Sequence, residues 1–317
     1  MTSTVLGTDE ATDWRAVLGS DEIRELQVLR DWRSWFSLGL NWLIIFAAFA
    51  LVAVWPNVLT IILSLFLIGG RQLGLAIFMH DASHHALFSR PAVNDWAGNW
   101  LAAYPIWGDL GPYRPYHLRH HAHTWTEKDP DVPLATPFPV SRASLRRKVW
   151  RDLSGQTGFK RAVATWRRDL ERSQGKVRRT DGGGIHRLAG VAVTNAIMLV
   201  LLAAAGHPAL YLLWVVAWLT TYSLVMRIRS IAEHSMPTDR SDEFGNTRTT
   251  LASWWERLFI APNRVNYHLE HHLLMRVPHY NLPRMHARLK ESEALSGALV
   301  CTGYMEVLRR AASKDQT

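Results

Sequence analysis

The stretch HLEHH at residues 268–272 is the last of three histidine clusters, and the rest of the chain is understood most easily from them. The other two are HDASHH at 80–85 and HLRHH at 117–121, and a single histidine, His234, stands between the second and third clusters. Residues three and four apart share one face of a helix, so the histidines of a cluster can aim at one point. In the first cluster, His80 and His84 form a four-apart pair. With the three histidines of each other cluster and His234, nine imidazoles are grouped in this way, which is too many for one ion and indicates two metal ions. Imidazole binds zinc, copper, iron and nickel alike, so the spacing does not name the metal.

Four long apolar segments surround these clusters. They cover residues 38–55, 58–79, 188–205 and 209–226. About 20 apolar residues cross a bilayer, so the sequence predicts four transmembrane helices. The very short connections at 56–57 and 206–208 predict that the four helices form two hairpins. Buried helices of a soluble protein are the alternative, but two pairs of this length would be unusual in such a protein.

The basic residues predict the orientation in the membrane. Of the 36 Lys and Arg residues, only Arg71 falls inside the four segments. The positive-inside rule therefore places both termini and the central region in the cytoplasm, at the inner or plasma membrane if the protein is bacterial. Topology and attraction to anionic lipid explain the net charge of +9, so no nucleic-acid partner is expected. The first 37 residues are polar and charged, unlike a cleaved signal peptide.

The second and fourth segments continue as far as His84 and His234. A helix from Val58 to His84 rises roughly 40 Å at about 1.5 Å per residue, which exceeds the roughly 30 Å of hydrocarbon. Both helices are therefore expected to carry histidine out of the membrane on the same side. A metal transporter would place its ligands near the middle of the membrane. It stays a distant alternative, as does a zinc-dependent hydrolase.

These observations predict an all-α integral membrane protein with a cytosolic helical cap that holds the metal site. Residues 1–37 are expected to form a cytosolic segment with an interfacial amphipathic helix. The main domain is expected over residues 38–310, with the cap formed by 80–187 and 227–310. Residues 311–317 are expected to be a disordered tail. The single cysteine, Cys301, excludes an internal disulfide and a cysteine metal site.

The three clusters, combined with four membrane segments, resemble the membrane fatty acid desaturase superfamily over roughly residues 38–290. Asp129-Pro130-Asp131 after the second cluster and the stretch 277–280 (VPHY) after the third agree with this resemblance. The superfamily includes acyl-lipid and sphingolipid desaturases and related hydroxylases and ketolases. The resemblance implies two iron ions held mainly by histidine, which use O2 to remove hydrogen from an unactivated C–H bond.

The resemblance also implies which residues bind the metal. Carried over residue by residue, the ligands are His80, His84, His117, His120, His121, His234, His268, His271 and His272. No catalytic residue beyond these ligands is implied. Further ligands or supporting residues are expected among Asp81, His85, His123, Ser230, Glu233 and Glu270. The acidic side chains of this set can orient imidazoles through their free N–H groups. Ser230 occupies a position where some relatives have an Asn that binds metal through water.

The resemblance favours a desaturase that acts on the acyl chain of a fatty acid or lipid. A hydroxylase or ketolase of a lipid, a carotenoid or another apolar molecule is the close alternative, because the first step is the same. The two electrons that the reaction needs must come from outside the chain, which has neither a His-Pro-Gly-Gly segment nor an iron–sulfur cysteine set. A separate ferredoxin, rubredoxin or cytochrome b5-type carrier with its reductase is implied, and the basic cytosolic surface suits an acidic carrier.

Overall fold

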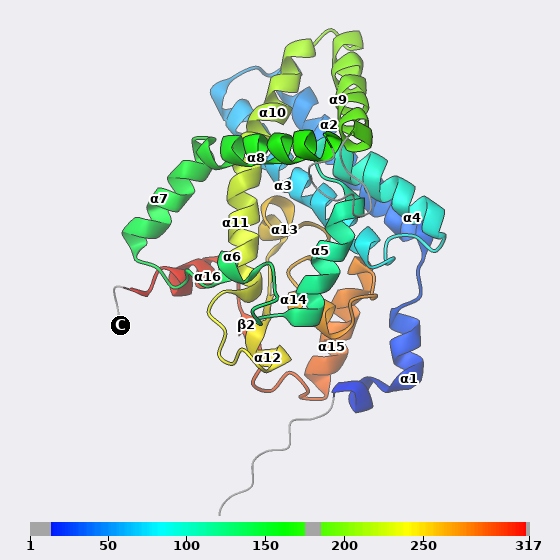
Figure 1. Cartoon of the computed structure of the whole chain (residues 1–317), viewed down its shortest axis with the longest axis vertical. Helices are drawn as coiled ribbons and strands as arrows, with labels where there is room; N and C mark the ends of the chain where they lie inside the picture. The colour runs from blue at the N-terminus through cyan, green and yellow to red at the C-terminus, as the bar shows by residue number, and fades with distance from the viewer. Residues whose placement is uncertain (1–13, 175–184, 315–317) are drawn as a thin grey trace, which may run out of the picture.

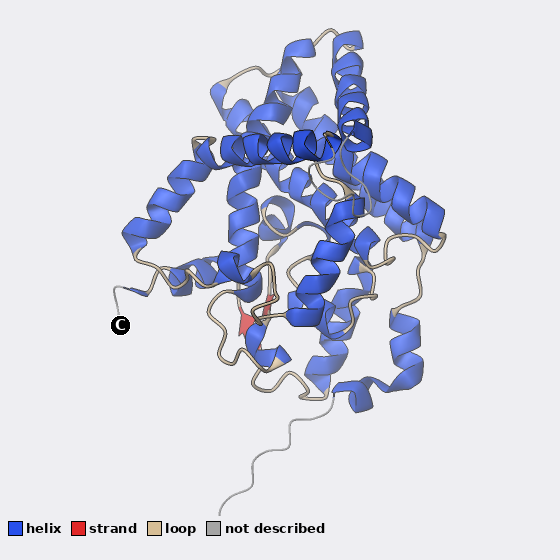
Figure 2. Cartoon of the chain, in the orientation of Figure 1, coloured by secondary structure: helices blue, strands red, loops and turns tan. Residues whose placement is uncertain are grey.

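The computed structural model describes residues 14–174 and 185–314, which fold mostly into helices (Figure 1, Figure 2). The longer helices are α1 (Trp14–Leu26), α2 (Asp31–Val54), α3 (Val58–Ser83), α5 (Leu110–His123), α7 (Arg142–Leu153), α8 (Gln156–Ser173), α9 (Ile185–Ala204), α10 (Tyr211–Leu219), α11 (Thr221–His234) and α15 (Leu282–Glu291). The shorter elements are α4 (Pro91–Ala97), the π-helical η1 (Gly98–Ala103), η2 (Tyr104–Ile106), α6 (Val132–Ala135), η3 (Pro208–Leu210), α12 (Glu243–Asn246), β1 (Arg248–Thr250), α13 (Trp254–Phe259), η4 (Pro262–Arg264), α14 (His268–Leu273), η5 (His279–Asn281), β2 (Leu299–Cys301) and α16 (Tyr304–Ala311).

Four helical stretches within the described residues are long and apolar enough to cross a membrane, as the sequence predicts. They are Asp31–Val54, Val58–Ser83, Arg187–Ala204 and Pro208–His234. The tight connection between the first two is built by Asn57, whose side chain accepts hydrogen bonds from the backbone N–H groups of Leu59 and Thr60. Thr60 in turn accepts from the Asn57 N–H, so the first turn of α3 is capped from both directions.

Helix α3 packs against α2, α10 and α11 and has more neighbouring elements than these helices do. The Asn41 side chain of α2 donates to the carbonyl of Arg71, and Thr221 at the start of α11 donates to the carbonyl of Leu65. A Cβ on Gly69 would lie 2.3 Å from the Thr221 hydroxyl oxygen and 2.8 Å from the backbone nitrogen of Tyr222. A residue without a side chain is therefore required where these two helices cross.

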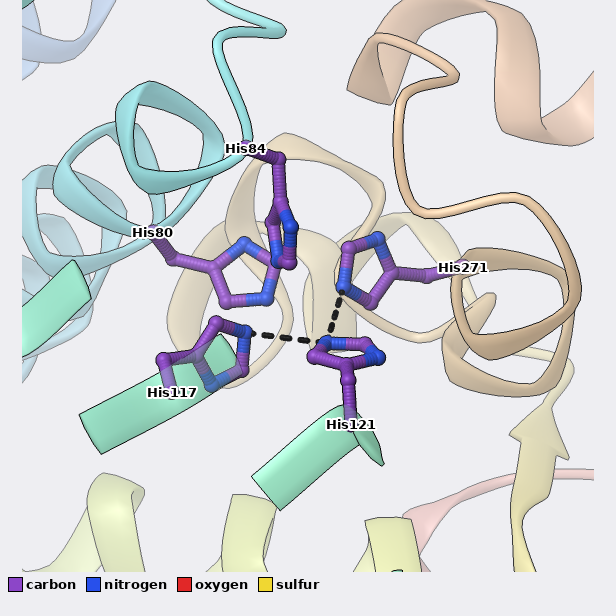
Figure 3. A group of neighbouring side chains, drawn as sticks. All are labelled: His80, His84, His117, His121 and His271. Carbon is purple, nitrogen blue, oxygen red and sulfur yellow. Dashed lines mark hydrogen bonds between the residues drawn. The ribbon is translucent and has the colours of Figure 1, made fainter. Parts of the chain in front are cut away.

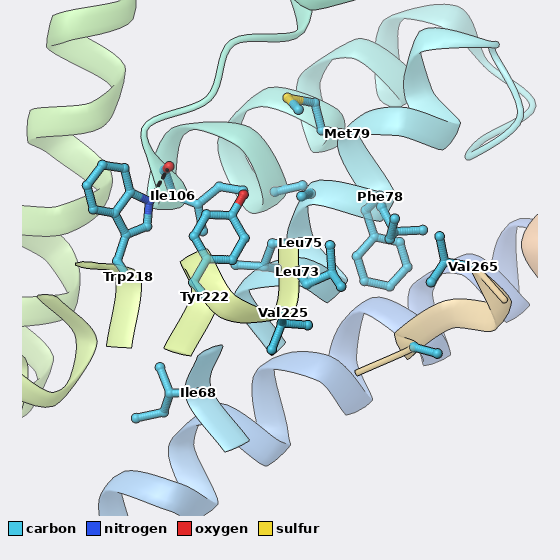
Figure 4. Packing of buried hydrophobic residues seen from close by; sticks show 14 of the residues in the cluster. Ile68, Leu73, Leu75, Phe78, Met79, Ile106, Trp218, Tyr222, Val225 and Val265 are labelled. Carbon is cyan, nitrogen blue, oxygen red and sulfur yellow. Dashed lines mark hydrogen bonds between the residues drawn. The ribbon is translucent and has the colours of Figure 1, made fainter. Parts of the chain in front are cut away.

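The main hydrophobic core lies around α3 (Figure 4). Ile68 and Leu75 of α3 are completely buried and belong to the same cluster as Trp218, Tyr222 and Val225 of the fourth membrane stretch. Ordinary packing of apolar side chains thus fixes the part of α3 that leads to the first histidine cluster. Between membrane helices, close van der Waals packing rather than removal from water stabilises such contacts.

The fourth membrane stretch is bent at Thr220, whereas the sequence suggests one continuous helix up to His234. Thr220 has φ −111° and ψ −86°, and its hydroxyl donates back to the Val216 carbonyl, a contact that commonly bends helices. Helix α8 crosses at this bend (Figure 1), where a Cβ on Gly158 would lie 2.2 Å from the Leu219 carbonyl oxygen. The Arg161 side chain of α8 donates to the Trp218 carbonyl at 2.8 Å. The bend at Thr220 is therefore contacted by α8, through the close approach at Gly158 and the hydrogen bond from Arg161.

The described residues are not entirely helical, so the all-α expectation is correct only in outline. Strands β1 and β2 form a two-stranded parallel sheet (Figure 2), in which Thr249 pairs with Val300. Thr249 also forms a bridge to Tyr267, next to α14. Three-residue strands that are distant in sequence leave no alternating pattern, which is why the sequence does not reveal them.

The two ends of the chain are described in part. In the N-terminal segment, α1 packs against α15 through Trp14, Leu18 and Leu26, and residues 1–13 lie outside the described residues. At the other end, the carbonyl of Ala311 accepts a hydrogen bond of 2.8 Å from the N–H of Val140. Residues 311–314, the first part of the expected disordered tail, are therefore among the described residues. Residues 315–317, the rest of that expected tail, lie outside them.

Candidate metal centre

The histidine clusters and His234 lie on four helices that meet at one place. His80 occupies the last turn of α3 and His84 follows its end, while the second cluster fills the last two turns of α5. His234 is the last residue of α11, and α14 is formed by the third cluster, which begins at His268. The fold therefore brings together all nine histidines that were expected as ligands.

These nine histidines form two groups, of which Figure 3 shows the first. The first group is His80, His84, His117, His121 and His271, and the second is His120, His234, His268 and His272. Within each group, one ring nitrogen per residue lies within 4.8 Å of those of all other members. The second and third clusters therefore do not each aim at one point but contribute to both groups. Neighbouring helical residues diverge by about 100°, which sends His120 and His121 to different groups.

The distances between ring nitrogens suit metal ligands. The Nε2 atom of His121 lies 3.0 Å from that of His117 and 3.1 Å from that of His271, the two contacts drawn in Figure 3. In the second group, the Nε2 atom of His234 lies 3.1 Å from that of His120 and 2.9 Å from that of His268. Two nitrogens bound to one ion at about 2.1 Å and at right angles lie about 3 Å apart.

In the second group, the hydrogen-bond partner of the Nδ1 atom determines which ring nitrogen of a histidine carries the hydrogen. His120 Nδ1 lies 2.8 Å from a carboxylate oxygen of Asp129, and His234 Nδ1 lies 3.3 Å from the carbonyl oxygen of Asn246. These oxygens accept hydrogen bonds, so in the neutral rings each Nδ1 carries the hydrogen and each Nε2 presents a lone pair. Two lone pairs facing each other at 3.1 Å repel unless a cation lies between them. The group is therefore arranged for a positive ion.

Several ring nitrogens of the site are buried without a hydrogen-bond partner among the described residues. They are Nε2 of His80, both nitrogens of His84 and Nε2 of His272. Burial also holds the pKa values of His84, His117, His121, His268, His271 and His272 well below the usual histidine value. Neutral imidazoles with free lone pairs are what a metal requires of its ligands, so the residues present fit a metal centre.

The six residues expected as further ligands or supporting residues differ in whether they contact the candidate metal ligands. Asp81 contacts the Nδ1 atom of His80 at 3.0 Å, and Glu233 approaches that of His268 at 3.5 Å. Glu270 is buried but bonds to Thr249 and His286. The structure does not bring the remaining three, His85, His123 and Ser230, into either group of nitrogens. His85 lies 4.0 Å from Asp95, and Ser230 lines a cavity beside the site.

Two supporting residues were not among the sequence candidates. Asp129 binds His120, and its other oxygen accepts from the backbone N–H of Trp125. His279 Nδ1 donates a hydrogen bond of 2.9 Å to the second carboxylate oxygen of Asp81, which extends the support of His80 by one residue. In the sequence, Asp129 stands out only as part of the segment that follows the second cluster. An Asp nine residues after a histidine has no helical relation to it, so spacing alone could not assign its role.

A cavity of about 210 Å³ opens beside the second group. Three members of that group line it, His120, His234 and His268. The ring of Tyr113 stacks on His117 with 5.2 Å between the ring centres, and Met226 adds an apolar wall. Arg229 and Glu233 also line the cavity and form an ion pair. The cavity is thus a place where part of a substrate can lie directly against the candidate metal ligands.

Comparison with known proteins adds the family. The family model described as fatty acid desaturase matches residues 53–303, which include all three clusters and His234. The chain belongs to this family. Within the described residues, this member of the family has four helices long enough to cross a membrane and a histidine site able to hold metal.

Curated relatives carry desaturase names at low identity. Dihydrorhizobitoxine desaturase of Bradyrhizobium elkanii is 28% identical over 69% of this chain, and the match spans 65% of that protein's own length. An sn-1 oleoyl-lipid 12-desaturase of Anabaena variabilis is 24% identical over 71% of the chain and 67% of the relative. A chloroplastic omega-6 fatty acid desaturase of Glycine max is 24% identical over 91% of the chain and 65% of the relative. The substrates in these names differ from one another.

Proposed function

We propose that the protein is a membrane-bound, O2-dependent di-iron oxidoreductase that desaturates the acyl chain of a fatty acid or lipid. The observation that carries the proposal is the convergence of the Nε2 atoms of His120, His234 and His268, whose lone pairs face one another in a buried site. Family membership supports iron as the metal and desaturation as the reaction. The nine histidines in two groups support two ions.

The net reaction defines what the protein has to provide. Two hydrogens leave adjacent carbons of the chain, and together with O2, two electrons from a carrier and two protons they give two molecules of water. When bound, the iron centre supplies the oxidising power that breaks an alkyl C–H bond. The protein residues hold that centre, keep bulk water away and position one C–C bond of the substrate.

The described side chains suit these tasks. Asp129, Asp81 and the Asn246 carbonyl fix the orientation of three imidazoles through their Nδ1 atoms. The cavity beside the second group offers an apolar surface at Met226, against which a methylene pair can lie. Restricting water near a reactive centre also prevents side reactions.

The substrate is proposed from the relatives, two of which are named for oleoyl-lipid and fatty acid substrates. Hydroxylation of an apolar substrate is the second candidate, because it starts from the same C–H cleavage. The electrons are proposed to come from a ferredoxin, a rubredoxin or a cytochrome b5-type carrier and its reductase. We place both termini and the histidine site in the cytoplasm, where such a carrier can reach them.

The test combines product and metal analysis. Lipids of cells that express the wild type are compared by mass spectrometry with those of cells that express the His271→Ala, His272→Ala double variant. We expect a product two hydrogens lighter, which disappears in the variant together with at least half of the bound iron. The matched control is His207→Ala, because His207 is exposed and belongs to neither group.

Other outcomes separate the alternatives. A product heavier by one oxygen would assign the protein to hydroxylation. Zinc in place of iron, with turnover that needs no O2, would contradict the oxidoreductase proposal. Unchanged iron content in the double variant would show that these histidines do not hold the metal. Size-exclusion profiles and circular dichroism of all variants keep loss of folding apart from loss of metal.

A further inference from the structure

A second hollow lies away from the cavity at the metal site and has a different chemical character. Its volume is about 520 Å³, and it lies between the start of α2, α3, α13, η4 and η5. Four of its lining residues are arginines, namely Arg33, Arg71, Arg257 and Arg264. No Asp or Glu is among the described residues that line it. We refer to it as the arginine hollow.

The four arginines have no carboxylate partner within the described part of the chain. Elsewhere, Arg114, Arg187 and Arg227 pair with Asp95, Asp169 and Asp152. In the arginine hollow, by contrast, the recorded contacts are to carbonyls and rings. Arg257 donates to the Ala252 carbonyl, and the guanidinium of Arg33 lies 5.2 Å from the centre of the Tyr280 ring. Concentrated positive charge without a carboxylate favours an anion from outside the chain.

Arg71 supplies the second observation. It lies on α3 inside a candidate membrane span, and it is 6% exposed. One terminal nitrogen donates to the carbonyls of Arg257 and Leu258, but its buried Nε has no hydrogen-bond partner among the described residues. A charged residue within a membrane span usually has a functional partner. Here the unpartnered donor belongs to a side chain that lines the hollow.

The rim of the hollow is apolar on the α2 side. Trp32 and Phe36 line it, and each is 65% exposed. Further along the same membrane helix, Leu43 is 63% exposed. An occupant of the hollow would therefore meet guanidinium groups at one end and a lipid-facing helix at the other. Basic pockets between membrane helices are typical sites for anionic lipid headgroups.

We propose that the arginine hollow binds the phosphate of an anionic phospholipid whose acyl chains lie along α2. The hollow is joined to the metal site by a chain of contacts. His279 lines the hollow and contacts Ser37 at 3.1 Å and Asp81 at 2.9 Å, and Asp81 contacts His80 at 3.0 Å. A bound headgroup would thus be linked through His279 and Asp81 to His80, a candidate metal ligand. The binding itself does not depend on the proposed desaturation.

The experiment measures lipid binding by the full-length protein. Wild type in detergent is titrated with phosphatidylglycerol and, separately, with phosphatidylcholine, and bound lipid is counted by native mass spectrometry. The variant is the triple Arg33→Gln, Arg257→Gln, Arg264→Gln, which leaves the buried Arg71 in place. The control is Arg146→Gln, Arg147→Gln, Arg151→Gln on α7, where the same charge is removed from exposed positions.

We expect the wild type and the α7 control to retain phosphatidylglycerol and to prefer it over phosphatidylcholine. The triple variant in the hollow should bind phosphatidylglycerol at least tenfold more weakly, since each basic residue near an anionic headgroup contributes about fivefold. The corresponding triple Lys variant, which keeps the charge, should restore most of the binding. Thermal unfolding of each variant shows whether it is folded.

Three outcomes would overturn the proposal. Equal binding of the two lipids by the wild type would show that the headgroup charge is not recognised. Displacement of phosphatidylglycerol by millimolar inorganic phosphate would mean that free phosphate, not a lipid, is the ligand. Loss of reduction by an acidic electron carrier in the triple Gln variant, with lipid binding unchanged, would assign the hollow to a protein partner.

Discussion

Nδ1 of His120 lies 2.8 Å from Oδ1 of Asp129, and both side chains are almost completely buried. Because Asp129 accepts this hydrogen, the Nε2 lone pair of His120 is directed at His234 and the second group. The carboxylate is itself fixed by the backbone N–H groups of Trp125 and Asp131. Asp129 is therefore a positioning residue for a candidate metal ligand.

Replacing Asp129 by Ala should lower metal affinity by about 10- to 100-fold, the usual effect of removing the carboxylate behind a histidine ligand. Iron titration of the purified protein measures this affinity without any assay of activity. Glu127→Gln is the control, since Glu127 is exposed and only two residues away. If both variants bind iron as the wild type does, Asp129 does not act through His120.

Removing metal should destabilise the protein. A ligand that binds only the folded state at 100 times its Kd adds about 2.7 kcal/mol, and without it the Nε2 lone pairs of His120, His234 and His268 repel one another. We expect chelation to lower the Tm of the wild type by several degrees. In His268→Ala the same treatment should cause a much smaller shift. Identical shifts in both proteins would argue against metal at the second group.

The cavity beside the second group should control turnover. Ala135 is buried in its wall, and Ala135→Leu adds volume where the substrate is proposed to lie. Product formation should fall at least tenfold while iron content stays unchanged. Ala143→Leu on the exposed side of α7 is the matched control. A variant with a filled cavity and normal turnover would show that the substrate reaches the metals by another route.

The crossing of α3 and α11 should tolerate no side chain at Gly69. A Cβ there would meet Thr221 at 2.3 Å and the Tyr222 backbone nitrogen at 2.8 Å, so Gly69→Ala should destabilise the protein by about 1–3 kcal/mol. A Cβ on Gly39 of α2 would have no neighbour within 4 Å, so Gly39→Ala should be neutral or slightly stabilising. Thermal unfolding in the same detergent compares the two. Equal Tm values would contradict the close helix crossing.

The amino-acid sequence by itself determined that the chain has four helices of membrane-crossing length and that nine particular histidines belong together. Both signals are local. A run of about 20 apolar residues is visible in the sequence whatever surrounds it. Three histidine clusters with helical spacing indicate a shared site, although this spacing does not tell which of the two groups each histidine joins. Helical rise was also enough to predict that α3 and the fourth membrane stretch carry His84 and His234 beyond the apolar segments.

Only the tertiary structure decided how the histidines divide and what supports them. His120 and His121 point about 100° apart on α5, but which other histidines each of them joins depends on the helices that α5 faces. Asp129 and His279 become supporting residues only when chain segments meet in space. The arginine hollow likewise joins Arg33 to Arg264, which are far apart in the chain. Such relationships arise from packing between helices, which spacing within one helix does not encode.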